Sequence, residues 1–140
     1  MNRYIVWLWM CSVMLLHAEV THLWADEAFL EKNITIIDIR TPTEWEDKGV
    51  VYGSHLLTFF EENGEFNVSN FKVKLENIVE KEQPFALLCR VGKRSRIVAD
   101  FLSKTFHFHV INLKGGIMHL IYKGYATKAY QKMPKKLKLD

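Results

Sequence analysis

Apolar and polar positions alternate along the chain in blocks that predict strands and helices in turn. Three nearly continuous apolar runs lie at residues 35–39, 85–89 and 110–113. Runs of this length, without strict alternation, are typical of strands that are buried on both faces of a sheet. Apolar residues at helical spacing occupy segments between and around these runs, namely 24–32, 71–81, 95–104 and 116–123. This order predicts an α/β fold, a parallel sheet with helices on both faces, as a domain of three layers.

The most clearly marked element is a short helix directly after the first apolar run. Thr41 is followed three residues later by Glu44, which is the spacing of a capping box, and Pro42 occupies the first helical position. Gly49 is typical of the end of such a helix. The sequence therefore predicts a helix over residues 42–48, placed at the end of a buried strand.

The remaining segments are shorter or more polar. Residues 50–51 and 55–59 are expected to form short extended pieces, and residues 61–69 a surface loop. Length and composition agree with one globular domain, because the chain has 140 residues, of which 49% are hydrophobic and 25% charged. We assign residues 19–130 to this domain and residues 131–140 to a Lys-rich C-terminal tail.

The first residues carry the pattern of an export signal. Arg3 precedes an uncharged apolar run at residues 4–16, which is shorter than the ~20 residues that a membrane-spanning helix needs. Ala18 is a small residue suited to cleavage before Glu19. Residues 1–18 are therefore predicted to be a signal peptide, which would place the mature protein in a periplasm. The alternative is an uncleaved N-terminal anchor, and only in that case is a membrane an expected partner.

Charge and cysteine content exclude several classes of function. The formal net charge is +3 and no basic stripe runs along the chain, so nucleic acid is not an expected partner. The chain has two cysteines, Cys11 in the predicted signal and Cys89, so the mature domain has neither an internal disulfide nor a zinc site built on several cysteines. His107 and His109 have no third ligand at metal-site spacing, and the sequence has no glycine-rich phosphate fingerprint. We therefore expect neither a metal nor a cofactor.

The segment most informative about chemistry is residues 88–95. Cys89 ends an apolar run and precedes a predicted helix, and the loop between them holds one glycine, one valine and three cations: Arg90, Val91, Gly92, Lys93 and Arg94. Backbone N–H groups in a tight turn can form an anion-binding nest, and the positive end of the following helix points the same way. Together with the cations, these donors favour the charged form of the thiol, which is a nucleophile that needs no general base. A cysteine that only fills space at a strand end would not require this surrounding charge.

Four landmarks, in this order, resemble the rhodanese-like (sulfurtransferase) domain family over residues 20–125. The first two are Asp38-Ile39-Arg40, similar to a strand-ending Asp-x-Arg, and Glu44-Trp45 followed by residues 49–54, similar to Glu-aromatic and Gly-His-Ile-x-Gly-Ala. The third is Cys89-Arg90-Val91-Gly92-Lys93-Arg94-Ser95, which is similar to the active-site loop Cys-Arg-x-Gly-x-Arg-Ser. The fourth is Leu113-Lys114-Gly115-Gly116, similar to the closing Leu-x-Gly-Gly.

The resemblance implies a persulfide enzyme. Cys89 would take sulfane sulfur from a donor and carry it as a persulfide, held by the backbone amides of residues 90–94. Arg94 would close the loop and, with Arg90 and Lys93, attract an anionic donor. The implied partners are a small anionic sulfur donor, thiosulfate or polysulfide, and a thiol or cyanide-like acceptor.

Three further residues would support the loop rather than react. Asp38 and Arg40 would do so from the neighbouring strand end by charge-assisted hydrogen bonds, and Ser95 from the start of the following helix. An ordinary ion pair at the strand end is the alternative for Asp38 and Arg40. In either case their role is structural rather than chemical.

Three functions stay open on the sequence. A sulfurtransferase is favoured, a non-catalytic module that binds or carries sulfur is the alternative, and a cysteine-dependent phosphatase is less favoured. Loop length bears on the last of these, because phosphatase relatives have five residues between the cysteine and the arginine, whereas four residues separate Cys89 from Arg94. A shorter loop makes a smaller nest, which suits a sulfur atom better than a phosphate.

Overall fold

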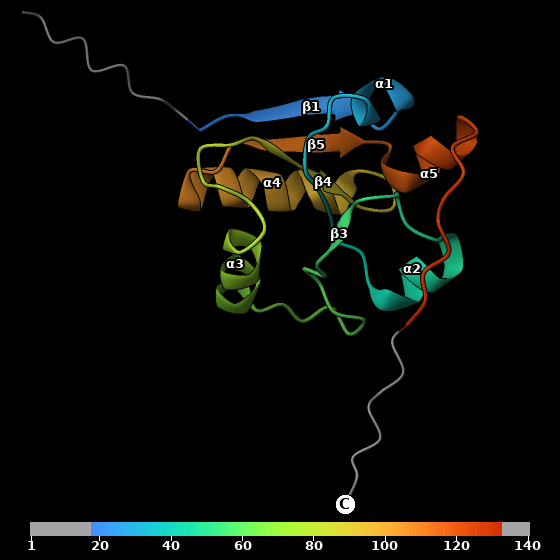
Figure 1. Cartoon of the computed structure of the whole chain (residues 1–140). Helices are drawn as coiled ribbons and strands as arrows, with labels where there is room; N and C mark the ends of the chain where they lie inside the picture. The colour runs from blue at the N-terminus through green and yellow to red at the C-terminus, as the bar shows by residue number, and fades with distance from the viewer. Residues whose placement is uncertain (1–17, 133–140) are drawn as a thin grey trace, which may run out of the picture.

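The computed structural model describes residues 18–132, which form an α/β domain on one five-stranded sheet (Figure 1). The strands are β1 (Val20–Trp24), β2 (Ile36–Asp38), β3 (His55–Leu56), β4 (Phe85–Leu88) and β5 (Val110–Lys114). Their order across the sheet is β1-β5-β4-β2-β3, and every neighbouring pair is parallel. The helices are α1 (Glu27–Leu30), α2 (Pro42–Lys48), α3 (Val68–Glu76), α4 (Lys93–Phe106) and α5 (Gly116–Tyr122).

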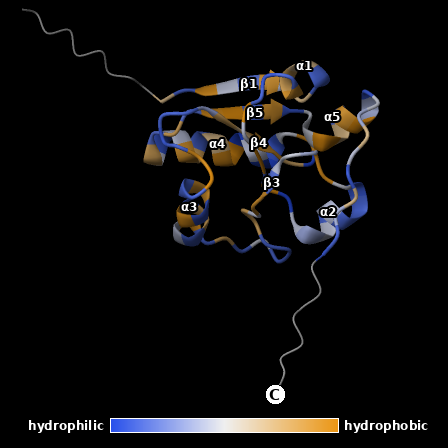
Figure 2. Ribbon diagram, in the orientation of Figure 1, coloured by the Kyte–Doolittle hydropathy of each residue, from blue (hydrophilic) through white to orange (hydrophobic). Residues whose placement is uncertain are grey.

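The sheet separates two apolar clusters, because alternate residues of each strand face opposite sides. Ile37 of β2 and Leu87 of β4 belong to the cluster that α3 and α4 cover. Ile36 and Ala86 belong to the cluster that α1 and α5 cover. Figure 2 shows β5 in the apolar colour and α3 and α4 with both apolar and polar residues, as expected for helices with one buried face. The predicted fold class is thereby confirmed.

The N-terminal part of the domain differs from the prediction of a helix over residues 24–32. Residues 20–24 form the strand β1, and α1 is only one turn long, capped by the side chain of Asp26, which accepts a hydrogen bond from Phe29 N at 2.9 Å. β1 is an edge strand that pairs only with β5, and most of its residues are partly or fully exposed. Its sequence therefore lacks the apolar run that marked the buried strands.

The helix expected over residues 71–81 was also placed wrongly. α3 begins at Val68, because Asn67 caps it by accepting a hydrogen bond from Asn70 N at 2.9 Å, and it ends at Glu76. Val79 lies beyond the helix, yet it is buried in the same cluster, since a turn after α3 keeps it on the inner side. The helical spacing of the apolar residues thus continued past the helix itself.

The ends of the chain bear on the predicted signal and tail. Apart from Ala18, the predicted signal peptide lies outside the described residues, as do residues 133–140 of the predicted tail. Within residues 18–132, no helix is long and apolar enough to cross a membrane.

Candidate active site

Cys89 lies at the carboxyl end of β4, the middle strand of the sheet. Its neighbours β2 and β5 run parallel to β4, so the loops that follow all three strands meet at one edge of the sheet (Figure 1). Cys89 is 1% exposed, and it is the free cysteine of the part of the chain that the structure describes. The site is therefore built from the residues that follow these strands.

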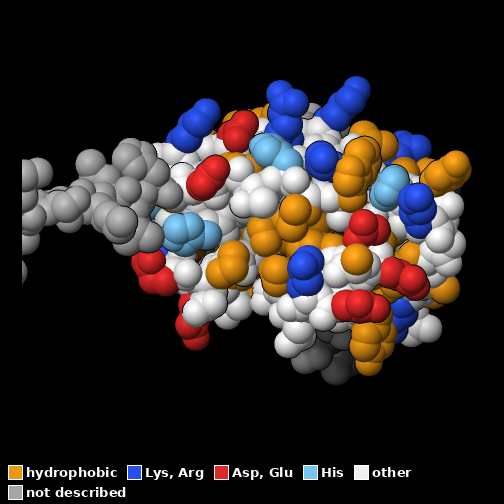
Figure 3. Space-filling model, turned by 90° about the horizontal axis from the view of Figure 1, so that it is seen from above, with side chains coloured by type: hydrophobic (Ala, Val, Ile, Leu, Met, Phe, Trp, Pro, Cys, Tyr) orange, Lys and Arg blue, Asp and Glu red, His pale blue; other side chains and the backbone are white. Residues whose placement is uncertain are grey.

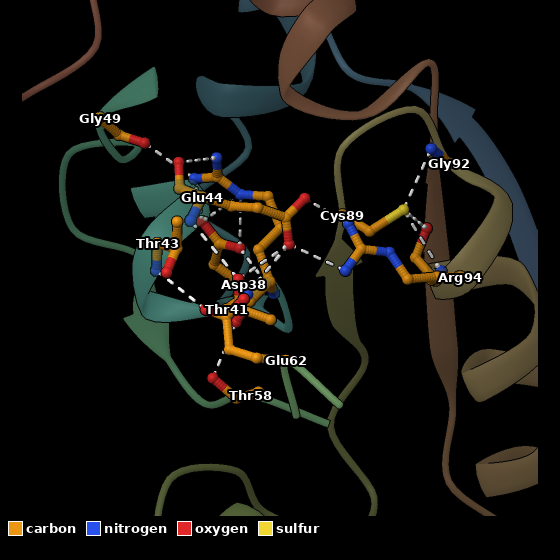
Figure 4. Close-up of polar contacts among 12 residues, drawn as sticks. Asp38, Thr41, Thr43, Glu44, Gly49, Thr58, Glu62, Cys89, Gly92 and Arg94 are labelled. Atoms are coloured by element: carbon orange, nitrogen blue, oxygen red, sulfur yellow. Dashed lines mark hydrogen bonds and ion pairs between the residues drawn. The ribbon is translucent and has the colours of Figure 1, made fainter. Parts of the chain in front are cut away.

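The sulfur of Cys89 is contacted by two backbone amides and one hydroxyl. The N–H of Gly92 donates to Sγ at 3.1 Å and the N–H of Ser95 at 3.4 Å (Figure 4). The hydroxyl oxygen of Ser95 lies 3.3 Å from Sγ. The amides that reach the sulfur are thus those of residues 92 and 95, rather than all of those in the segment 90–94. Ser95 contacts the sulfur itself.

Gly92 allows the turn that brings these amides together. It is the N-cap of α4, which starts two residues earlier than the sequence indicated, and its φ of 88° lies in the left-handed region that favours glycine. A Cβ at this position would lie 2.9 Å from the backbone nitrogen of Gly115. The N-terminal end of α4 therefore lies at the sulfur, with the N–H groups of Gly92 and Ser95 in contact with it, and the positive end of the helix favours negative charge there.

The start of α5 supports the same loop from the other side. Ile117 N–H donates to the carbonyl oxygen of Cys89 at 3.0 Å, and Met118 N–H donates to that of Arg90 at 3.1 Å. Gly116 lies so close to these carbonyl groups that a Cβ would collide with them. The Gly-Gly pair of the sequence thus lets two backbone segments pack against each other.

Arg94 extends toward α2 rather than toward the sulfur (Figure 4). Its Nη1 donates to Glu44 Oε2 at 2.9 Å, and its Nη2 donates to Glu44 Oε1 at 2.5 Å. In this bidentate arrangement the positive charge of Arg94 is already paired. Arg94 closes the loop by tying α4 to α2. That it also attracts an anionic donor, together with Arg90 and Lys93, stays a prediction.

The Glu44–Arg94 pair gives an expected dependence of stability on pH. Burial by itself would raise the pKa of Glu44, but hydrogen bonds from Arg94 and Thr41 N–H and the charges of Arg94 and Arg40 outweigh it, so the pKa lies below its ordinary value. A carboxyl group with a lowered folded pKa contributes stability that is complete above its unfolded pKa and is lost as pH falls through the folded pKa. We therefore expect the free energy of unfolding of the wild type to fall as the pH drops below about 4.3. Glu44→Gln lacks this carboxylate, so it is expected to lack this part of the fall.

Urea unfolding of both proteins over roughly pH 3 to 6 measures this component. Glu46→Gln is the matched control, because Glu46 is an exposed residue of the same helix. A constant difference between wild type and Glu44→Gln across this range would contradict the assignment.

Asp38, the last residue of β2, forms a buried ion pair with Arg40, and each is 0% exposed. Arg40 Nη2 donates to Asp38 Oδ2 at 2.7 Å and Arg40 Nε donates to Asp38 Oδ1 at 3.0 Å. The guanidinium also donates to the carbonyl oxygens of Glu44, at 3.1 Å, and Gly49, at 2.8 Å. These side chains therefore bind each other and the two ends of α2, and the expectation of direct hydrogen bonds to the cysteine loop was wrong. Their support is indirect, because α2 presents the Glu44 carboxylate to Arg94.

The remaining residues of the loop lie at its surface, next to a cleft. Arg90 and Lys93 are exposed, and Val91 is 48% exposed. The cleft has a volume of about 580 Å³ and runs between the start of α4 and the strands β1 and β5. Lys93, Arg96 and Lys114 line it together with Val91, so it combines positive charge with some apolar surface.

The sequence did not single out two polar residues that complete the surroundings of the sulfur. Ser95 Oγ donates to Asn112 Oδ1 at 2.6 Å, and Asn112 Nδ2 lies 3.1 Å from His22 Nδ1. Asn112 is 2% exposed on β5, and an amide inside the apolar run 110–113 was its only signal in the sequence. His22 belongs to β1, the strand that the sequence did not reveal.

No metal centre is formed by the residues from 18 to 132, where no group of three or more His, Cys, Asp or Glu side chains is arranged to hold an ion. His107 ends α4 with a left-handed φ of 60°. The carbonyl oxygen of His109 accepts a hydrogen bond from Phe85 N–H at 3.2 Å. In both residues the backbone has a structural role.

Together, the fold and the site define a parallel α/β domain whose central strand ends at a cysteine, in a loop that directs backbone N–H groups at the sulfur. A family model described as the rhodanese-like domain matches residues 21–120. The chain belongs to the rhodanese-like domain family.

Solved structures share this fold. A rhodanese-like domain protein from Staphylococcus aureus has a TM-score of 0.55 at 16% identity, over 81% of this chain and 99% of that one. A rhodanese-related protein from Thermoplasma volcanium has a TM-score of 0.54 at 25% identity, over 74% of this chain and 94% of that one. A protein from Rhodopseudomonas palustris described as a possible tyrosine phosphatase has a TM-score of 0.51 at 20% identity, over 72% of this chain and 75% of that one. A search of the curated proteins found no match.

Proposed function

We propose that this protein is a sulfurtransferase that moves sulfane sulfur from thiosulfate or a polysulfide to a thiol or cyanide-like acceptor through a persulfide on Cys89. The observation that carries the proposal is the donor set at the sulfur, with the N–H groups of Gly92 and Ser95 at 3.1 and 3.4 Å from Sγ. Preorganised amide donors stabilise a negative charge without reorganising during the reaction. The same donors can serve a thiolate in one state and a persulfide anion in the other.

Two half-reactions follow from this arrangement. The thiolate of Cys89 attacks the outer sulfur of thiosulfate, a new S–S bond forms, the original S–S bond breaks, and sulfite leaves with its electron pair. The acceptor then attacks the terminal sulfur of the persulfide. The Cys89 thiolate is restored, and the product is thiocyanate from cyanide or a new persulfide from a thiol. A covalent intermediate between two substrates predicts ping-pong kinetics.

Geometry favours sulfur over phosphate at this loop. Four residues separate Cys89 from Arg94, and the guanidinium of Arg94 is bound by the Glu44 carboxylate on both nitrogens. A phosphatase would need these N–H groups for the oxygens of a phosphate, since bidentate arginine contacts are the usual recognition of that group. Hydrolysis of a phosphate ester by the purified protein would support this alternative instead.

Intact mass after exposure to thiosulfate or polysulfide is the test of the proposal. The protein is expected to gain the mass of one sulfur atom, localised by digestion to the peptide that contains Cys89, and to lose it on addition of cyanide with release of thiocyanate. Sulfur that is gained and not turned over would identify the non-catalytic carrier. Failure to gain sulfur from either donor would contradict the proposal.

Export to a periplasm is the other part of the proposal. Its support is the sequence of residues 1–18, of which only Ala18 is described by the structure. N-terminal sequencing of the mature protein should begin near Glu19. A soluble cytoplasmic protein that begins at Met1 or Asn2 would contradict export, and an intact segment in the membrane fraction would establish the anchor.

A further inference from the structure

A chain of hydrogen bonds connects the sulfur of Cys89 with the surface cleft beside the loop. Ser95 Oγ lies 3.3 Å from Sγ and 2.6 Å from Asn112 Oδ1. Asn112 Nδ2 lies 3.1 Å from Nδ1 of His22, an exposed residue that lines the cleft. The chain thus passes from α4 through β5 to the edge strand β1.

The fold alone does not account for the amide of Asn112. The other residues of the run 110–113 are apolar and buried, and an apolar side chain would fit the pattern of β5. A buried amide without hydrogen-bond partners is destabilising, so each of its polar atoms needs one. Here one polar atom faces the Ser95 hydroxyl and the other faces His22.

The direction of donation in this chain determines what the sulfur receives. Ser95 has one hydroxyl hydrogen, and it is donated to Asn112 Oδ1. The hydroxyl oxygen then presents a lone pair to Sγ, which suits the S–H of a neutral thiol and not an anionic sulfur. If the amide of Asn112 is turned, Nδ2 donates to Ser95 Oγ and the hydroxyl hydrogen is free to donate to Sγ.

The turned amide also requires a change at His22. Its Oδ1 then faces Nδ1 of His22, which must carry a hydrogen to donate to it. The tautomer or protonation state of an imidazole is set by its partners, so the states of His22 and Cys89 are coupled.

We propose that His22, acting through Asn112 and Ser95, sets the direction of the hydrogen bond at the sulfur of Cys89 and thereby its readiness to carry negative charge. With Nδ1 as an acceptor the chain favours the thiol, and with a hydrogen on Nδ1 it favours the thiolate and the persulfide anion. His22 and Asn112 are thus positioning residues. The inference rests on the proposed function only in taking Cys89 as the reactive group.

The surroundings of His22 allow this state to respond to what enters the cleft. The charged groups that line the cleft with His22 are Lys93 and Arg96 of α4 and Lys114 of β5, and no acidic residue is among the lining residues. Figure 3 shows several Lys and Arg side chains along the upper edge of the view, with acidic side chains at its left part. An anionic substrate attracted there would lie beside His22, at the outer end of the chain of hydrogen bonds.

The test is the rate at which iodoacetamide alkylates Cys89 in the full chain between about pH 5 and 9, read on the Cys89 peptide so that Cys11 does not interfere. Asn112→Leu removes the oxygen to which the Ser95 hydroxyl donates, so the hydroxyl is expected to donate to Sγ instead. Alkylation at pH below the wild-type midpoint is expected to rise roughly tenfold, as for one charge-assisted hydrogen bond. Asn112→Asp provides only acceptors, so alkylation is expected to slow.

Three further variants separate this direction effect from a packing effect. In a Ser95→Ala background, Asn112→Leu is expected to leave the alkylation rate of Cys89 unchanged, because no hydroxyl is present to donate to the sulfur. His22→Phe is expected to speed alkylation less than Asn112→Leu, since the amide is then free to turn. His55→Phe, at an exposed histidine on the opposite edge strand β3, is the matched control and is expected to change nothing.

The inference would be overturned if Asn112→Leu and Asn112→Asp changed the alkylation rate of Cys89 in the same direction. It would also be overturned if Asn112→Leu still raised that rate in the Ser95→Ala background. If one of the two Asn112 variants fails to fold, the His22→Phe and His55→Phe comparison still decides, because equal rates in these two would also overturn it. Alkylation involves no sulfane sulfur. The inference can therefore fail while persulfide formation succeeds, and the proposed function can fail while the alkylation rates behave as expected.

Discussion

Replacing Cys89 by serine is expected to abolish sulfur transfer and leave the fold intact. A serine hydroxyl is nearly isosteric with the thiol but is not ionised in this nest, so the attack on sulfane sulfur loses its nucleophile. The rate of the thiosulfate and cyanide reaction should fall by at least about a thousandfold, which corresponds to about 4 kcal/mol of activation free energy. Steady-state thiocyanate formation measures the loss, and urea unfolding verifies the fold.

Cys11→Ser, with both proteins prepared as the full, uncleaved chain, is the matched control, because it is the same substitution at the other cysteine of the chain. It is expected to keep full activity. Wild-type activity in Cys89→Ser would remove the basis of the functional proposal, whatever the control shows.

Replacing Asp38 by alanine is expected to have the largest effect on stability. Arg40 is 0% exposed, and without Asp38 its charge would stay buried without the carboxylate that is hydrogen-bonded to it. Loss of one partner of a buried ion pair costs about 3–5 kcal/mol, which should appear as a lower urea midpoint. Turnover should fall as well, since α2 then holds Glu44 and Arg94 less firmly, but by less than in Cys89→Ser.

Asp47→Ala provides the comparison for this experiment. Asp47 lies in α2 and pairs with Lys48, but its side chain is 63% exposed, so its removal should change the free energy of unfolding by no more than about 0.5 kcal/mol. Equal stability of Asp38→Ala and Asp47→Ala would show that the buried pair does not hold α2.

Local patterns in the sequence were sufficient for much of the fold. The apolar runs at 35–39, 85–89 and 110–113 match the three central strands to within one residue at each end, because a strand buried on both faces is mostly apolar. The capping box of Thr41 and Glu44 forms as predicted, with both of its hydrogen bonds present. β1 was not predicted because an edge strand needs no such run, and α3 was misplaced because its first turn follows a polar cap, Asn67, inside a segment that reads as a loop.

The cysteine loop was predictable for the same reason. Cys89, Gly92 and Ser95 lie within seven consecutive residues, and a tight turn into a helix brings their backbone groups together without help from distant segments. The chemistry of the nest is thus encoded locally, as a glycine that permits the turn and a helix that begins directly after it.

What surrounds the loop was decided only by tertiary structure. Glu44 is read in the sequence as a helix cap, yet its carboxylate also binds Arg94, which is 50 positions away. Asn112 and His22 are 90 positions apart and meet because β1 and β5 are neighbours in the sheet. Local sequence rules reach only about four residues along a helix or two along a strand, so they specify turns, caps and buried runs. The partners of a charged or polar side chain depend on which strands lie side by side, and that follows from the packing of the whole domain.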